Sequence, residues 1–298
     1  MKRALFLALK VIALTIILFI CVAVAGTVVG LQDNTQPPAD ANAAVPTLVA
    51  VCFLQTIVLT YLILRSRWTG WRLMAAVFVA FYGVTTFVPQ IESAVFLTRL
   101  PPGTVPRLFL MGALIAAPYS ALAVLILGKR KAETVDVQPD SRLDMPVSEW
   151  TWKIAVIVVA YLILYFTFGY YIAWRNPAVL EYYGGTDPGG LLPQMASVLW
   201  KTPWLVPLQI LRALCWAGLA VLVIRMMKGQ WLESALVIAL LFSVVMNVLL
   251  LLPNAYMPAP VRMAHLVETG SSNFIFGLLI GWLLPSHTSA SVARVQLS

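Results

Sequence analysis

Eight long apolar segments constrain this chain more than any other feature of its sequence. A helix that crosses a membrane needs about 20 consecutive, mostly apolar residues. The segments that meet this requirement are 5–30, 45–64, 72–97, 108–127, 152–174, 204–226, 233–252 and 264–284. The connections between them are polar or rich in proline and glycine, and none is long enough for a separate domain. The sequence therefore predicts an all-α fold, a polytopic integral membrane helix bundle with about eight transmembrane helices.

The composition agrees with a chain that is largely covered by lipid. Apolar residues make up 61% of the 298 positions and charged residues only 11%, whereas a soluble domain carries about 25% charged residues. One soluble core cannot hide this much apolar surface. The three cysteines all lie inside apolar segments and form no CxxC pair, which argues against a disulfide framework or a zinc ribbon.

The basic residues predict the orientation of the bundle. The net charge of +8 does not indicate a nucleic-acid partner, because the cations do not gather with stacking aromatics on a soluble module. Fourteen Lys and Arg residues lie at the segment ends that share a side with the N-terminus. The opposite ends carry five, namely Arg99, Arg107, Arg175, Lys201 and Arg262. Because Lys and Arg favour the cytoplasmic side, we expect both termini in the cytoplasm and a bacterial-type plasma membrane.

Two features of the chain's organisation have alternative interpretations. The basic start and the apolar run that ends at Ala23-Val24-Ala25 also fit a secretory signal, but the run is long enough to span, and we expect a first transmembrane helix. Arg65 and Trp71 lie 160 positions before Arg225 and Trp231, at equivalent turns. This weak echo favours two four-helix halves in the same orientation, 1–127 and 151–298, with a cytoplasmic linker at 128–150 and a short cytoplasmic tail. Coincidence is the alternative, since interfacial Trp and Arg are common.

Ionisable side chains inside the apolar segments indicate a candidate site. Such residues are costly in lipid and usually face a protein interior or a water-filled cavity. The direction of each segment places them in one leaflet, the outer one. His265, Glu268 and Ser272 stand at i, i+3 and i+7, which is one face of a helix. The candidate ligand-binding residues are Glu92, Arg212, Asn247, His265, Glu268, Ser272 and Asn273.

These residues predict an outward-facing polar pocket. Its expected partner is a small polar or anionic ligand, a lipid head group or a partner helix, with membrane lipid around the bundle. The structural alternative is an ion pair between Glu92 and Arg212 that locks two helices, with His265 and Glu268 at the lipid–water boundary. In either case we expect at least one of Arg212 and Arg262 to bond a carboxylate of the cluster.

Two further functions remain open as alternatives. A metal-dependent hydrolase would use Glu92, His265 and Glu268 as ligands, but HxxE is a short pattern, and nearby arginines disfavour a metal. A secondary transporter ranks third, because a conduit needs polar lining through both leaflets and the inner half carries no acidic residue at depth. We therefore expect neither a cofactor nor a resident metal, and an enzyme less than a binding protein. No residue receives a catalytic role.

Two local patterns complete the expectations. Residues 191–200, in the longest outer loop, predict a short helix that either lies on the membrane surface or covers the pocket. Gly277 and Gly281 form a GxxxG pattern, which indicates close packing of the last helix against a neighbour.

Overall fold

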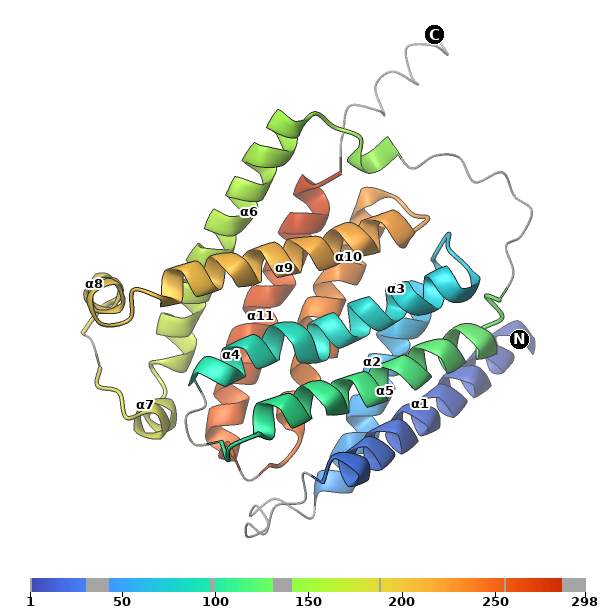
Figure 1. Ribbon diagram of the computed structural model, residues 1–298, viewed down its shortest axis with the longest axis horizontal. Coiled ribbons are helices and arrows are strands. Elements are labelled where there is room, and N and C mark those ends of the chain that lie inside the picture. The colour runs from blue at the N-terminus through green and yellow to red at the C-terminus, as the bar shows by residue number, and fades with distance from the viewer. Residues whose placement is uncertain are drawn as a thin grey trace.

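The all-α prediction is confirmed by the fold. The computed structural model describes residues 2–30, 43–96, 100–130, 141–187, 189–254 and 256–285. Within these residues eight helices are long and apolar enough to cross a membrane. The described chain has no β-strand, and a single antiparallel bridge joins Ser66 and Met227. The protein is therefore a multi-pass membrane helix bundle (Figure 1).

The eight spans include three that are built from more than one helical element. They are α1 (Lys2–Val29), α2 (Ala44–Leu64), α3 with η2 and α4 (Gly70–Tyr82, Gly83–Phe87, Val88–Phe96), α5 (Thr104–Ile126), α6 with η4 (Val147–Phe168, Gly169–Ala173), α9 (Leu205–Met226), α10 with η5 and η6 (Trp231–Leu240, Leu241–Val245, Val248–Leu251) and α11 (Ala259–Leu283). The shorter elements between spans are η3 (Ser141–Leu143), α7 (Pro177–Tyr183) and α8 (Leu191–Lys201).

The span boundaries differ from the expected ones by at most five residues. The largest differences are the starts of α6 and α11, which lie at Val147 and Ala259 rather than at 152 and 264. In both cases the helix begins directly after a proline, Pro146 or Pro258, whose extended backbone ends the preceding loop. Each first turn contains a charged residue, Glu149 or Arg262, which lowers the local hydropathy, so an apolar segment read from the sequence begins later. As a consequence, α6 begins inside the expected linker 128–150.

Three spans contain a π-helical turn, in which a backbone N–H bonds the carbonyl five residues earlier. These turns, η2, η4 and η5, all lie in the second half of their spans. Pro89 follows η2 and has no N–H to donate to the carbonyl of Thr85, which disfavours a regular α-helix there. After η5, the side chain of Asn247 donates to the carbonyls of Phe242 and Ser243, at 3.0 and 2.8 Å. Such turns are frequent at functional sites.

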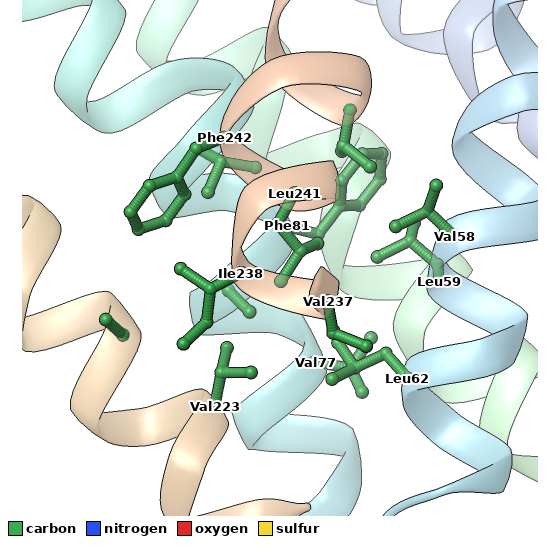
Figure 2. Close-up of a cluster of buried hydrophobic side chains, with 14 of the residues drawn as sticks. Val58, Leu59, Leu62, Val77, Phe81, Val223, Val237, Ile238, Leu241 and Phe242 are labelled. Atoms are coloured by element: carbon green, nitrogen blue, oxygen red, sulfur yellow. The ribbon is translucent and has the colours of Figure 1, made fainter. Parts of the chain in front are cut away.

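The apolar core lies between α2, α3, α9 and α10. Leu59, Phe81, Val223, Ile238 and Phe242 are all buried there and are grouped around α10 and η5 (Figure 2). In contrast, only 17% of the most apolar stretch of α1 is buried inside the bundle. It packs on α2 and α5 at the edge of the bundle, so its outer face is left for lipid.

The two groups of four spans repeat the same packing pattern. In each group the fourth span packs on the first and the third, and the first also packs on the second. The turns after α2 and α9 meet through two backbone hydrogen bonds, from Arg67 to Met226 at 2.7 Å and from Lys228 to Arg65 at 2.9 Å. The division into two halves stays a prediction, and this repeated packing agrees with it.

Candidate ligand-binding site

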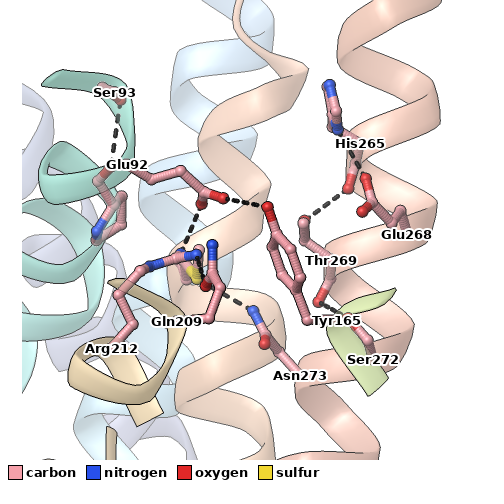
Figure 3. Close-up of polar contacts among 12 residues, drawn as sticks. Glu92, Ser93, Tyr165, Gln209, Arg212, His265, Glu268, Thr269, Ser272 and Asn273 are labelled. Atoms are coloured by element: carbon pink, nitrogen blue, oxygen red, sulfur yellow. Dashed lines mark hydrogen bonds and ion pairs between the residues drawn. The ribbon is translucent and has the colours of Figure 1, made fainter. Parts of the chain in front are cut away.

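An ion pair between α4 and α9 forms one side of the site. Nη2 of Arg212 lies 2.6 Å from Oε2 of Glu92. The Arg212 side chain is 3% exposed and the Glu92 side chain 29%, so one partner is buried and the other is partly accessible. Arg212 Nη1 donates to Gln209 Oε1 at 2.8 Å, and the Tyr165 hydroxyl donates to Glu92 Oε1 at 3.2 Å (Figure 3). This ion pair confirms the expected contact between Glu92 and Arg212. It also confirms that at least one of Arg212 and Arg262 bonds a carboxylate of the cluster.

A second group of polar contacts joins α7 and α11. His265 Nδ1 lies 2.7 Å from Glu268 Oε2, as their i, i+3 spacing on one helix allows. On the other side of the imidazole, Nε2 lies 3.2 Å from the Tyr183 hydroxyl. Burial raises the pKa of that hydroxyl, and nearby Tyr182 and the carboxylates of Glu92 and Glu268 raise it further. Tyr183 therefore stays protonated at neutral pH and is able to donate a hydrogen bond.

The structure of α7 explains why Tyr183 reaches His265. The Asn176 side chain caps the helix by accepting from the Ala178 N–H at 3.0 Å, and Pro177 occupies its first turn. Gly184 ends the helix in a left-handed conformation with a φ of 66°, which glycine adopts without strain. Buried contacts with Val261 and Ala264 then hold this short helix against the start of α11.

Tyr165 lies between the two groups. Its ring separates the Glu92–Arg212 pair from His265 and Glu268 in Figure 3. We call the whole set the polar cluster: Glu92, Tyr165, Tyr183, Gln209, Arg212, His265 and Glu268. Five helices supply it, so it depends on the tertiary fold rather than on one helix face.

The other expected site residues lie near the polar cluster, but their side chains bond other groups of the protein. Asn247 bonds the carbonyls of η5 and accepts a short hydrogen bond from the Thr269 hydroxyl. Ser272 donates to the Thr269 carbonyl at 3.4 Å, and Asn273 Nδ2 lies 3.3 Å from the sulfur of Met246. Arg262 donates to backbone carbonyls, including that of Met257 at 2.9 Å. These side chains therefore join helix ends and spans to one another.

The three candidate metal ligands form two separate contacts. Glu92 is held by Arg212 and Tyr165, whereas His265 and Glu268 bond each other. Among the residues that the structure describes, no group of three or more His, Cys, Asp or Glu side chains is placed to hold a metal ion. Glu92, His265 and Glu268 therefore do not form one ligand group among the described residues.

Two buried donors in the polar cluster have no acceptor within the described chain. They are Nε2 of Gln209 and Nε of Arg212, on residues that are 0% and 3% exposed. Buried polar groups in proteins are nearly always hydrogen-bonded, so unpaired ones require an explanation. Both donors lie on the face of α9 that meets Glu92 (Figure 3).

Tyr165 and Tyr183 were not among the expected site residues. Tyr165 lies about two helical turns before the end of its span, a depth at which tyrosine is also a common packing residue. Tyr183 belongs to a loop whose helix is too short for hydropathy to reveal. Only Gln209 carried a usable signal, because it stands three residues before Arg212 on the same helix face.

Comparisons with known proteins give this site no precedent. No family model matches the chain, and neither a curated protein nor a solved structure matches it. The function must therefore be inferred from the geometry of the polar cluster itself.

Proposed function

We propose that this membrane protein binds a small polar ligand or the head group of a lipid at the polar cluster. One observation carries the proposal, namely the two buried donors of Gln209 and Arg212 that have no acceptor in the described chain. An unpaired buried donor costs about 1–3 kcal/mol, and solvent outside the bundle does not reach these two, because their residues are 0% and 3% exposed. A bound molecule with an acceptor oxygen would remove this cost.

Partial exposure of the cluster supports access for a ligand. The Glu92 side chain is 29% exposed and the His265 side chain 20%. A purely structural ion pair would be expected to close over its charges and use all its donors. The cluster instead combines accessible charged groups with buried donors that remain free to bond.

The sidedness of the site is part of the proposal. The excess of Lys and Arg at the ends that share a side with the N-terminus supports cytoplasmic termini. Glu92 lies near the end of an odd-numbered span and Arg212 near the start of an even-numbered one, so both lie near the other side. We therefore assign the site to the outer leaflet of a bacterial-type plasma membrane.

Transport is a weaker candidate than binding. Two buried polar residues beyond the cluster, Gln55 and Thr56, form hydrogen bonds with other groups of the protein. Gln55 donates to the Val245 carbonyl at 2.8 Å, and Thr56 accepts from the Tyr119 hydroxyl at 3.1 Å. The buried hydroxyls of Thr60 and Ser120 have no partner in the described chain. Two hydroxyls do not line a path, however, because a conduit needs polar groups that are free to contact a solute along its whole length.

Native mass spectrometry of the purified protein tests the binding function. The wild-type protein should carry a bound small molecule or lipid, and Gln209→Leu should lose it because one of the free donors is gone. Gln230→Leu is the matched control, since Gln230 is exposed and lies outside the spans, and it should keep the bound mass. A wild-type spectrum without any bound mass, or equal occupancy in Gln209→Leu, would overturn the proposal.

A further inference from the structure

We infer that the ligand of the polar cluster carries an ammonium group, as an ethanolamine head group does, and an oxygen acceptor farther along the molecule. This inference rests on the proposed function and names the chemical class of its ligand. It follows from the charges of the cluster, from the partners of Glu268 and from the position of the two free donors.

The charges of the cluster are not balanced when His265 is neutral. Glu92 and Arg212 cancel each other in their ion pair. Glu268 remains, and within the described residues it forms no ion pair with Lys or Arg, since its charged-group contact is the one with His265. Its side chain is only 10% exposed, so water screens its charge weakly.

Two cations are able to balance Glu268, a proton on His265 or the ammonium group of a ligand. With neutral His265, Nδ1–H donates to Glu268 and Nε2 accepts from Tyr183. With protonated His265, both ring nitrogens donate, to the same two partners. Every charged or titratable group of the cluster then belongs to one of the two carboxylate contacts or is a neutral tyrosine.

An anionic ligand fits this inventory poorly. It would lie beside two carboxylates, while the positive charge of Arg212 is already bonded to Glu92 at 2.6 Å. The sequence alone did not distinguish an anionic ligand from a neutral one, because it does not show which arginines are already paired with a carboxylate. An ammonium group instead adds one positive charge where the cluster has one negative charge in excess.

The aromatic side chains support the same ligand class. The Tyr183 ring centre lies 5.8 Å from that of His265 and 6.0 Å from that of Trp174, and Tyr165 stands between the two carboxylates (Figure 3). Aromatic faces attract ammonium groups, most strongly where water is excluded. The donors of Gln209 and Arg212 lie on the other side of Tyr165 from Glu268 (Figure 3), so an oxygen that reaches them belongs to a part of the ligand beyond its ammonium group.

A proton and an ammonium group would compete for Glu268. Ethanolamine should therefore bind more weakly as the pH falls through the titration of His265, because protonated His265 already balances the carboxylate. The other groups facing this pair are Glu92 from α4, Tyr165 from α6, Tyr183 from α7 and Arg212 from α9. None of them gives the cluster a second free positive charge.

Thermal stabilisation by two probes tests the ligand class. The full-length protein is placed in nanodiscs of phosphatidylglycerol, which has no amine, and titrated with ethanolamine or with inorganic phosphate. Ethanolamine should raise the unfolding midpoint, and phosphate at the same concentration should not. Glu268→Gln should weaken ethanolamine binding about tenfold or more. Glu181→Gln, an exposed change on α7, should stay within about twofold of wild type.

A lipid arm distinguishes the two sources of an ethanolamine group. If the ligand is a lipid, nanodiscs of phosphatidylethanolamine should stabilise the wild type but not Glu268→Gln, and added ethanolamine should then have little effect. If it is a free amino alcohol, only the soluble probe should stabilise the protein. Either result supports the inference.

Two outcomes would overturn the ammonium ligand. One is stabilisation by phosphate without stabilisation by ethanolamine or phosphatidylethanolamine. The other is stabilisation by ethanolamine that Glu268→Gln leaves unchanged. If a bound mass is still detected in the wild-type protein and lost in Gln209→Leu, the binding function stands and only its ligand class is wrong.

Discussion

Arg212 shows how much a single charged residue determines in this bundle. A guanidinium at this depth is tolerated because Glu92 and Gln209 bond it directly, at 2.6 and 2.8 Å. Chain direction placed Glu92 and Arg212 at a similar depth, which made an ion pair between them one of the expected arrangements, but only the fold shows that α4 and α9 are neighbours. The sequence could not predict Tyr183, because its place over His265 depends on the fold of a short loop helix.

Breaking one side of this ion pair should destabilise the protein strongly. Glu92→Gln and Arg212→Gln each leave an uncompensated charge, at a cost of about 3 kcal/mol, the lower end of the usual range because Glu92 is partly exposed. The double variant should lose less than the sum of the two single losses. Thermal unfolding in detergent of the four proteins measures this coupling.

The Arg65–Glu233 pair supplies the matched control. It also joins two spans, but its side chains are 47% and 19% exposed. Exposed pairs contribute about 0.2–1 kcal/mol, so the same pair of Gln substitutions there should have small effects. Additive losses at Glu92 and Arg212, or equal losses at both pairs, would mean that the buried contact does not form.

At the scale of elements, the sequence predicted the packing of α11 more fully than the irregular turns. The GxxxG pattern indicated a close helix contact, and the partner is α10. A Cβ on Gly277 would lie 2.5 Å from the Ala239 Cα, and one on Gly281 would lie 2.3 Å from the Ala235 Cα. The π-helical turns had only one local signal, Pro89 after η2, because tertiary packing decides where the other two form.

Filling this helix contact should therefore destabilise the bundle. Gly277→Ala and Gly281→Ala force backbone atoms apart, and overpacking of this kind costs about 1–3 kcal/mol. Gly270→Ala on the same helix is the control, because a Cβ there meets nothing within 4 Å. That change should be neutral or slightly stabilising, since alanine favours helix. Thermal midpoints that fall equally for all three variants would contradict the packing.

The helix α8 should lie on the membrane surface. Helix formation at 191–200 is confirmed, and the alternative that it covers the site is not supported, because none of its residues is buried. Leu192, Leu199 and Trp200 lie along one exposed face, with exposures of 79%, 61% and 86%. Figure 1 shows α8 beside the start of α9, outside the row of spans. Such an apolar face is typical of interfacial helices.

Spin labels measure this contact with lipid. Labels at positions 192 and 199 should be more accessible to oxygen than to a water-soluble nickel reagent, because oxygen concentrates in lipid. A label at Thr186, an exposed polar position just before α8, should show the reverse. If positions 192 and 199 resemble position 186, α8 lies in water and not on the bilayer.

At the scale of the whole molecule, hydropathy predicted the spans well because length and apolar content alone decide them. Hydropathy does not predict which spans pack together, because no local signal specifies that α11 packs on α6 and α10. The division into two halves stays a prediction. The polar cluster does not follow that symmetry: of the seven residues, only Glu92 comes from the first four spans.

The orientation of the bundle gives a prediction for the intact molecule. In a variant without Cys21, Cys52 and Cys215, a single cysteine at Thr186 should react with a membrane-impermeant thiol reagent in intact cells. Cysteines at Ser148 and Gln230 lie at the opposite ends of spans and should react only after the cells are opened. Labelling at 148 with protection at 186 would reverse the orientation.

The central claim is that the polar cluster is a binding site and not a closed ion-pair lock. An experimental density map of the protein purified from its own membrane tests this claim most directly. We predict non-protein density that contacts Gln209 Nε2 and Arg212 Nε on one side and Glu268 on the other. A map in which those two donors bond only protein groups, with no other density between Tyr165 and His265, would contradict the account.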